Sequence, residues 1–394
     1  MPTYRTPGVY VEEVGLRTET ITGVDTTTCA FVGPTHAALA PGEPPPLLTS
    51  VAEFERHYGD AADLSFEGHA TPHYLAHAVR AFFAEGGRRL HVSPVARAVE
   101  CGGRDRPFEV SDYAHALRAL EAVEDIRTVA APGATEWCDD PAALAQALIT
   151  HAAQPRMHRF AVLDAPRGAG TESVLDLRRK LESPHAALYY PWVETRGTDA
   201  TGAPARLLQP PSGFVCGVYA RNDVERGVHV AAANQALRSA TGFERTITTP
   251  QQEQLNPEGV NCLRSFPGRG HRVWGSRTTS SSPEWIYVNV RRYIDYVEAS
   301  IGRGLDWVSL EENGPSLWVK VRGAIEEFLA REWTKGTLAG TRPDHAWFVR
   351  CDAGTMTDAD VAGGRVVAIV GLAMLKPAEF ILLRVALASR PGRG

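Results

Sequence analysis

In the first half of the chain, short continuous apolar runs alternate with stretches in which apolar residues recur at helical spacing. The runs are rich in β-branched and aromatic residues and predict strands at residues 26–32, 90–92, 127–131, 160–163 and 187–190. The stretches between them predict helices at residues 111–123, 141–151 and 171–182, with Ser111 as an N-cap and Pro141 in a first turn. Strands and helices that alternate in this way favour a mainly parallel sheet covered by helices.

The last third of the chain carries longer helical patterns. We expect one helix from Glu284 to about Ser300, where Gly302 and Gly304 break the pattern, and a second helix over residues 315–336. Apolar runs at residues 346–351 and 365–372 predict strands. Six of the eight tryptophans also lie in this third. They predict either a large aromatic core or contacts between subunits.

Two segments show neither the helical spacing nor the apolar run of a strand clearly. Residues 196–213 contain few large apolar residues and many Gly, Pro and Ala, which predicts an exposed loop. Residues 246–279 predict an irregular connection between two domains.

Both ends of the chain are β-prone. The run Val9–Val14 follows Pro7-Gly8, and the run Phe380–Leu387 follows Pro377. A terminal strand either pairs within its own domain or adds to the sheet edge of another copy. If both ends add to other copies, each subunit is linked to neighbours on two sides.

Composition narrows the class of protein. The chain has 394 residues, 44% of them hydrophobic, and a formal net charge of −5, so we expect a globular protein without a basic surface for nucleic acid. The N-terminus lacks a signal-peptide pattern, and the longest apolar runs are too short to span a bilayer, so we expect assembly in the cytoplasm. The six cysteines show no CxxC spacing, which favours buried reduced thiols.

No set of residues forms a complete catalytic motif. The segment Arg167–Thr171 follows a strand and opens a helix, but it lacks the lysine and the glycine spacing of a phosphate loop. His69, His73 and His77 lie at helical spacing without a carboxylate at a metalloprotease position. We therefore predict no catalytic residue, no metal site and no cofactor.

Five stretches in order carry a family resemblance. They are Thr6-Pro-Gly-Val-Tyr-Val-Glu-Glu, Pro210-Pro-Ser-Gly-Phe-Val-Cys-Gly-Val-Tyr-Ala-Arg-Asn-Asp-Val-Glu-Arg-Gly, Val273-Trp-Gly-Ser-Arg-Thr, Glu284-Trp-Ile-Tyr-Val-Asn-Val-Arg-Arg and Lys376-Pro-Ala-Glu-Phe-Ile. With them the chain resembles the sheath protein of contractile phage tails and related contractile injection systems, a group that includes R-type pyocins, antifeeding prophages and Photorhabdus virulence cassettes. It departs from the family at Ala231-Ala-Ala-Asn, where a proline is common after the first alanine.

The resemblance implies a fold of class α/β and α+β. A core sheath domain, made of the N-terminal arm and the C-terminal third, carries an inserted α/β domain. The expected boundaries are residues 1–24 for the N-terminal arm, 25–245 for the inserted domain on the outer surface, 246–375 for the core domain facing an inner tube and 376–394 for the C-terminal arm.

The resemblance also implies a structural protein and no enzyme. Six-subunit rings would stack around an inner tube, and the stack would contract from an extended metastable state to drive the tube into a target. The expected partners are other copies of the chain, the inner tube protein, and baseplate and cap proteins, without nucleic acid or direct membrane insertion. Such a particle stays in the cytoplasm of a bacterium or is released.

Particular residues receive roles from this reading. Strand exchange between subunits is expected at Val9, Tyr10, Val11, Glu12, Val14, Phe380, Ile381, Leu382, Leu383 and Val385. Hinges are expected at Gly15, Gly23, Gly354 and Gly363, and contact with the inner tube at Arg291, Arg292, Asp295 and Glu298. Two other classes stay open, a static tube lattice that never contracts and a nucleotide-binding α/β enzyme.

Overall fold

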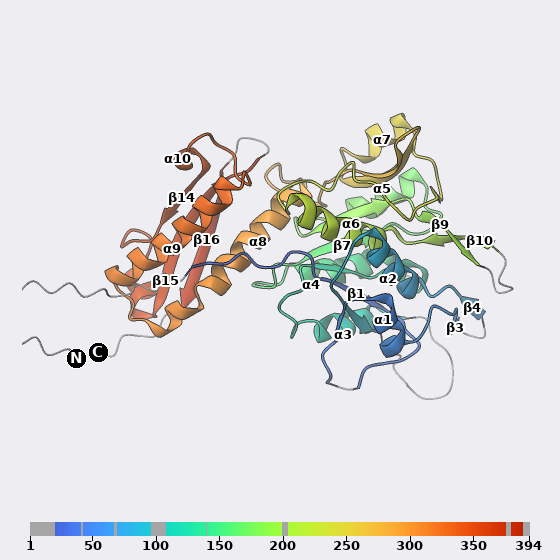
Figure 1. Ribbon diagram of the computed structural model, residues 1–394, viewed down its shortest axis with the longest axis horizontal. Coiled ribbons are helices and arrows are strands. Elements are labelled where there is room, and N and C mark those ends of the chain that lie inside the picture. The colour runs from blue at the N-terminus through green and yellow to red at the C-terminus, as the bar shows by residue number, and fades with distance from the viewer. Residues whose placement is uncertain are drawn as a thin grey trace, which may run out of the picture.

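The chain forms two lobes of unequal size, joined along one long helix (Figure 1). The computed structural model describes residues 20–40, 42–66, 69–95, 108–138, 140–198, 204–375 and 380–388. In the last of these ranges it describes the backbone alone.

The larger lobe holds most of the secondary structure. Its strands are β1 (Cys29–Gly33), β2 (Leu47–Leu48), β3 (Leu64–Phe66), β4 (His69–Thr71), β5 (Leu90–Pro94), β6 (Thr128–Ala130), β7 (Phe160–Asp164), β8 (Ala186–Tyr190), β9 (Val193–Thr198), β10 (Pro204–Gln209), β11 (Gly242–Phe243), β12 (Val260–Phe266) and β13 (Gly270–Trp274). Its helices are α1 (Val51–Tyr58), α2 (Tyr74–Glu85), α3 (Val110–Ala119), the 3-10 turn η1 (Ala134–Glu136), α4 (Pro141–Ala152), α5 (Thr171–Arg179), α6 (Pro211–Arg226) and α7 (Thr249–Leu255).

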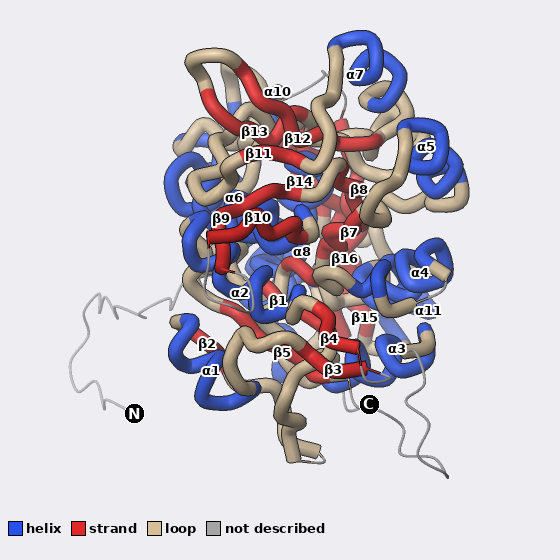
Figure 2. The backbone as a smooth tube through the Cα atoms, turned by 90° about the vertical axis from the view of Figure 1, so that its right-hand side faces the viewer, coloured by secondary structure: helices blue, strands red, loops and turns tan. Residues whose placement is uncertain are grey.

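One sheet of eight strands organises this lobe, in the order β13-β12-β8-β7-β6-β1-β5-β2. The six inner strands pair in parallel, and β13 and β2 are antiparallel to their neighbours at the two edges. The prediction of a mainly parallel sheet is confirmed. Figure 2 shows the strands inside the lobe with helices on either side of them.

The two faces of the sheet carry separate cores. Along β7, Ala161 and Leu163 join a core with α3, α4, α5 and α7, whereas Phe160 and Val162 join a core with α1, α2 and α6. This alternation follows from the two-residue period of a strand. On the second face α6 lies close to α2, because Gly213 and Gly217 leave no side chain between the two helices.

The smaller lobe consists of the chain from α8 onward. Its elements are α8 (Val288–Gly304), the 3-10 turn η2 (Asp306–Leu310), α9 (Pro315–Thr334), α10 (Pro343–Ala346), β14 (Trp347–Arg350), α11 (Asp358–Ala362), β15 (Arg365–Ala373) and β16 (Phe380–Ala388). The strands form an antiparallel sheet in the order β14-β15-β16. Residues of β15 such as Val366 and Val370 are fully buried in one core with Val321 and Phe328 of α9.

The structure corrects several predictions. The segment 196–213 is no loop, since it contains part of the β9–β10 hairpin and the start of α6. The segment 246–279 is not irregular either, because it contains α7, β12 and β13. Since β12 pairs with β8, the large sheet continues beyond the boundary that we expected at residue 245.

Two helix ends also differ from the sequence prediction. Helix α8 continues through Gly302 to Gly304, because a helix tolerates isolated glycines at some cost in stability. Helix α3 begins one residue before Ser111, and its capping box is formed by Glu109 and Asp112. The first turn of α4 contains Pro141 as expected.

Candidate assembly surface and the junction of the two lobes

The three-stranded sheet of the smaller lobe has an unpaired edge on each side. Among the described residues, β14 and β16 each pair only with β15. Strand β16, which contains five of the residues predicted to exchange between subunits, lies against β15 of its own chain from Arg365↔Ala388 to Ala373↔Phe380. The other five, from Val9 to Val14, lie outside the described residues. Exchange therefore stays a prediction.

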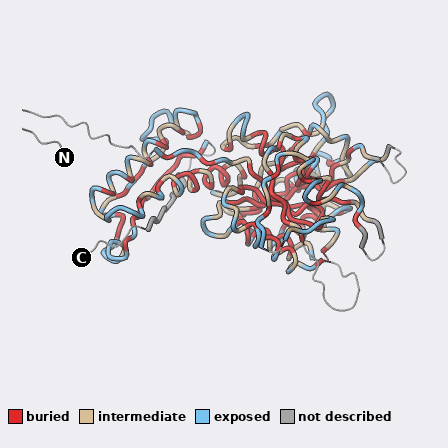
Figure 3. The backbone as a smooth tube through the Cα atoms, turned by 60° about the horizontal axis from the view of Figure 1, so that its bottom comes forward, coloured by how far each residue is buried: buried red, intermediate tan, exposed pale blue. Residues whose placement is uncertain are grey.

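Exposed apolar side chains concentrate in the smaller lobe. The large apolar residues that the described part of the chain exposes are Leu47, Val224, Leu310, Val319, Phe348, Val361 and Leu375. All but the first two belong to the smaller lobe. Figure 3 shows buried segments gathered inside the larger lobe and alternating buried and exposed segments along the smaller one. Single exposed apolar residues are ordinary on protein surfaces, so it is their concentration in one lobe that makes this lobe the candidate for contacts with another protein.

The end of the N-terminal arm is anchored in the smaller lobe. Ile21 is 1% exposed and shares the core of α8 and α9, and its carbonyl accepts a hydrogen bond from Arg331. The amide of Val24 donates to Ser300 Oγ at 3.1 Å. The start and the last third of the chain therefore form one packed unit.

The glycines that we expected as hinges lie in different surroundings. A Cβ on Gly23 would overlap the ring of Tyr296, so this glycine allows close packing. The amide of Gly354 donates to the carboxylate of Asp352 in a turn, and Gly363 ends α11. Gly15 lies outside the described residues, and the hinge roles stay predictions.

A buried ion pair ties α8 to the larger lobe. Arg292 donates to both carboxylate oxygens of Asp223 on α6, at 2.7 and 3.1 Å, and its guanidinium lies 4.6 Å from the ring centre of Tyr219. Burial works against the charge of Arg292, but Asp223 more than compensates and raises the pKa of the guanidinium. Because neither charge reaches solvent, the pair holds the two lobes together only while both members are present.

The other residues predicted to touch an inner tube are also engaged within the chain. Arg291 Nη2 lies 2.8 Å from Asp295 Oδ1 and 2.9 Å from Glu298 Oε2, and the guanidinium stacks over Trp285. Arg291, Arg292 and Asp295 are only 4–6% exposed. These side chains are buried because this face of α8 packs against the larger lobe. Contact with a tube stays a prediction.

Side chains of the protein itself fill the place where α/β sheets usually bind ligands, the carboxyl ends of the parallel strands. There the ring of Trp192 packs edge-on against Tyr74 at 5.1 Å between centroids. Asp164 accepts hydrogen bonds at 2.7 Å from both the amide and the hydroxyl of Ser212 at the start of α6, and burial raises its pKa to about 7. The amide of Gly168 donates to Glu244, so the glycine loop also has a structural partner.

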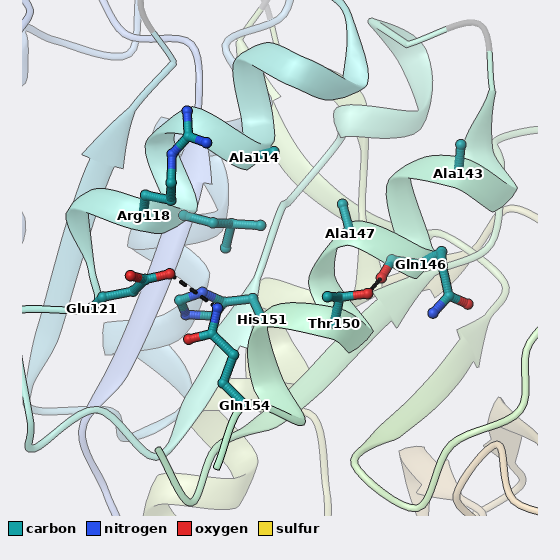
Figure 4. Close-up of a pocket in the computed structure, with 10 residues that line it drawn as sticks. Ala114, Arg118, Glu121, Ala143, Gln146, Ala147, Thr150, His151 and Gln154 are labelled. Carbon is teal, nitrogen blue, oxygen red and sulfur yellow. Dashed lines mark hydrogen bonds between the residues drawn. The ribbon is translucent and has the colours of Figure 1, made fainter. Parts of the chain in front are cut away.

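A groove of about 400 Å³ runs between α3 and α4 (Figure 4). It is lined by Ala114, Leu117, Arg118, Glu121, Ala143, Gln146, Ala147, Thr150, His151 and Gln154. Gln154 donates to Glu121 across it at 3.0 Å, and His151 accepts from the buried Arg159. Burial lowers the pKa of His151 to about 4, so this imidazole is neutral and acts as an acceptor.

No helix among the described residues is long and apolar enough to cross a membrane.

Family profiles match most of the chain. The phage tail sheath protein central domain matches residues 108–279, and the phage tail sheath C-terminal domain matches residues 280–388. The border between the two matches follows β13 and precedes α8, which agrees with the division into lobes.

Solved structures extend the likeness to nearly the whole chain. The helical sheath of the anti-feeding prophage in its contracted state is 30% identical, with a TM-score of 0.73 over 97% of this chain and 99% of the other. The sheath of an extracellular contractile injection system, PVC, also contracted, is 27% identical, with a TM-score of 0.75 over 98% of each chain.

A curated protein from a phage is also similar to part of this chain. The tail sheath protein of Burkholderia phage BcepMu is 32% identical over 162 residues, which cover 36% of this chain and 32% of the relative. The alignment therefore spans about a third of that relative. With both profiles matched in sequence order and two sheath structures matched almost end to end, the chain belongs to the family of sheath proteins of phage tails and contractile injection systems, a structural and non-enzymatic family.

Proposed function

We propose that this chain is the subunit of a sheath that assembles as stacked six-membered rings around an inner tube and contracts to drive that tube forward. The observation that carries the proposal is the smaller lobe, whose sheet has two unpaired edges among the described residues and whose surface exposes five large apolar side chains. The likeness of the whole chain to two contracted sheaths supports the same proposal.

The terminal arms link the subunits. Residues Val9 to Val14 of one copy add to the free edge of β14 in a neighbour, and the segment of β16 is passed to another copy. The same main-chain hydrogen bonds then form between chains instead of within one. Each hydrogen bond contributes only ~0.5–1.5 kcal/mol, but several per strand and two arms per subunit hold a lattice together.

The core sheath domain consists of the N-terminal arm and the smaller lobe, and the larger lobe is the inserted domain on the outside. Support comes from Ile21 and Val24, which pack on α8 and α9 although some 280 positions separate them in sequence. The arms bend near Gly15 to Gly23 and near Gly354 to Gly363 while the lobes move as rigid bodies.

Contraction draws its free energy from new contacts between subunits. The apolar side chains that one copy exposes become buried as the rings approach, at ~25 cal/mol per Å² of apolar area. A chain that is 30% identical to this one has been solved in the baseplate of the anti-feeding prophage, and we assign a baseplate, a cap and an inner tube protein as partners of this chain too. The tube faces the smaller lobe.

Electron microscopy of negatively stained particles tests the proposal. The full chain is expressed with and without an inner tube protein, beside a variant that lacks residues 1–14 and a control that lacks residues 389–394, which lie beyond β16. We expect tubes from the full chain and the control, in a long narrow form and a short wide form, and none from the variant. Tubes of a single fixed form would indicate a static lattice, and tubes from the variant would exclude the role of the N-terminal arm.

A further inference from the structure

Three arginines gather at the hairpin of β12 and β13, which lies at the end of the larger lobe that also holds β11 and α7 (Figure 2). Arg264 of β12 stands directly opposite Arg272 of β13 in the strand register. Arg269 lies in the turn between the two strands and is exposed. Like charges placed opposite each other on paired strands repel, so this arrangement by itself costs the fold stability.

The hydrogen bonds that the three guanidiniums donate do not neutralise them. Arg264 donates to the Thr249 hydroxyl at 3.4 Å, and its Nε atom is buried without a partner among the described residues. Arg269 donates to the amide oxygen of Asn234 at 2.6 Å, and Arg272 donates to the backbone carbonyls of Asn234 and Arg269 at 2.6 and 2.9 Å. All of these acceptors are neutral oxygens, so positive charge accumulates at one place on the surface.

Aromatic rings hold two of these arginines in position. The guanidinium of Arg269 lies 5.4 Å from the ring centre of Phe266 and 5.7 Å from that of Trp274. The guanidinium of Arg264 lies 5.3 Å from the Phe266 ring, and the two rings pack against each other at 4.5 Å between centroids. Because successive side chains of a strand point to opposite faces, Arg264, Phe266 and Trp274 share one face of the hairpin.

This combination of charge and ring suits a contact between proteins. Arginine and the large aromatic residues are the residue types enriched at the centre of protein interfaces. A guanidinium that is stacked on a ring is already oriented, so it loses little side-chain freedom when its planar fork of N–H groups binds a carboxylate. The hairpin therefore offers ordered donors to an acidic partner.

The partner that these charges fit is a second copy of this chain. The chain as a whole is acidic, with 46 Asp and Glu against 41 Lys and Arg, so a neighbouring copy presents more carboxylates than cations. A contact between two different surfaces of identical copies repeats along a helical stack, so one basic patch and one acidic surface serve every subunit.

We propose that the face of the β12–β13 hairpin that carries Arg264, Arg269 and their two aromatic partners binds an acidic surface of a neighbouring copy of this chain. The inference rests on the proposed assembly of the sheath and adds a charged contact to the pairing of the terminal arms. The contact is made by side chains and adds no strand to β13, whose free side is covered by residues 234–237. Arg272 has a different role, since its bonds hold the turn of the hairpin and residue 234 in place.

Sedimentation velocity of the full chain, with and without an inner tube protein, tests the contact. The variant is Arg264→Gln/Arg269→Gln, and the matched control is Arg56→Gln, because Arg56 is an exposed arginine on α1 of the same lobe. We expect wild type and control to self-associate, and the association of the double variant to be at least about tenfold weaker. A rise from about 50 to about 500 mM NaCl should weaken the wild type more than the double variant, because salt screens exposed charges.

Three results of this experiment would overturn the proposal. They are equal association of wild type and double variant, an equal loss in Arg56→Gln, and a wild type that stays monomeric under every condition.

Stability separates a contact between copies from a role within the fold. Because Arg264 is opposed by Arg272, the Tm of Arg264→Gln should be equal to or above that of the wild type while its self-association is weaker. A lower Tm in Arg264→Gln would mean that this arginine supports the hairpin itself, and would contradict the proposal.

Electron microscopy of the same samples separates this inference from the proposed function. Oligomers that need the two arginines but never form tubes would support the contact and contradict the sheath. Tubes as abundant from the double variant as from the wild type would support the sheath and overturn the contact. Fluorescence anisotropy with labelled double-stranded DNA covers another class of partner. Binding that the double variant loses while its self-association is unchanged would assign the patch to nucleic acid and overturn the proposal.

Discussion

The two lobes differ in how they finish their sheets. The larger lobe closes its eight-stranded sheet: the free side of β13 is covered by residues 234–237, with Asn234 and Leu237 donating to carbonyls of Val273 and His271, and β2 at the other edge is only two residues long. The smaller lobe leaves β14 and the nine-residue β16 without a second strand partner among the described residues. Edges of this kind are avoided unless another chain covers them. The eight-stranded sheet is therefore complete within the chain, whereas the sheet of the smaller lobe is suited to be completed by neighbours.

Removal of the Asp223 carboxylate on α6 should have the largest effect on the connection between the lobes. Asp223→Ala leaves the buried Arg292 without its carboxylate, so we expect the free energy of unfolding to fall by about 3–5 kcal/mol. Urea unfolding followed by tryptophan fluorescence measures it. Glu225→Ala, which removes an exposed ion pair with Arg238, is the control and should cost less than about 1 kcal/mol. Equal losses for the two variants would contradict the role of the buried pair.

Acid should weaken the larger lobe first. The pKa of His151 is about 4 in the folded protein, because of burial, against about 6.5 when unfolded. The unfolded chain therefore binds the proton more readily. The contribution of the neutral imidazole is present above pH 6.5 and is lost as the pH falls towards 4, by at most about 1.4 kcal/mol per pH unit.

The smaller lobe should respond less to acid, because His345 is the single histidine after residue 280. Chemical denaturation between pH 7 and 4.5, with hydrogen exchange to separate the lobes, measures the effect. His151→Gln should flatten the pH dependence of the larger lobe. An unchanged slope in that variant would mean that another group titrates.

A bulkier residue at the N-terminal anchor should loosen the smaller lobe. In Gly23→Val the added side chain overlaps Tyr296, and we expect a loss of about 1–3 kcal/mol and fewer assembled tubes. Gly302→Ala is the matched glycine control, because open space surrounds Gly302 and alanine favours the helix by about 0.5–1 kcal/mol. Both Tm and the number of tubes should fall in Gly23→Val and rise in Gly302→Ala. Similar behaviour would contradict the packing role of Gly23.

The smallest effect on stability, and the sharpest contrast between lobes, is expected at exposed apolar residues. Val319→Ser in the smaller lobe and Val224→Ser in the larger one, both well exposed on helices, should each change the free energy of unfolding by less than about 0.5 kcal/mol. Only the first should reduce assembly, which sedimentation of tubes measures. Reduced assembly in both would remove the distinction between the lobes.

The sequence predicted those parts of the fold in which local pattern and final packing agree. The buried run of β7 and the helix that follows Asp140 and Pro141 appear almost as expected, because a strand buried on both faces and a capped helix start are local features. The motif from Pro210 to Gly227 identified the family, but its helix α6 was missed. Its glycines resemble loop residues, and only contact with α2 explains them.

The charged residues of α8 show more clearly that local pattern does not predict burial by distant segments. The charges of Arg291, Arg292, Asp295 and Glu298 indicate a polar helix face in sequence. Yet the first three are buried and Glu298 is half-buried, because Asp223, His158 and His185 come from distant segments. No spacing rule connects two histidines in separate loops with carboxylates more than 100 positions later. In contrast, the C-terminal strand β16 could be predicted from the sequence, because strand propensity is local.

Cryo-electron microscopy of the assembled tubes tests the central claim most directly, since it shows what lies against the free edge of β14. We predict a strand formed by residues 9–14 of a neighbouring subunit at this edge, with the eight-stranded sheet of the larger lobe unchanged. Tubes in which β14 remains unpaired, or in which neighbours join through the edges of the larger sheet, would contradict the account.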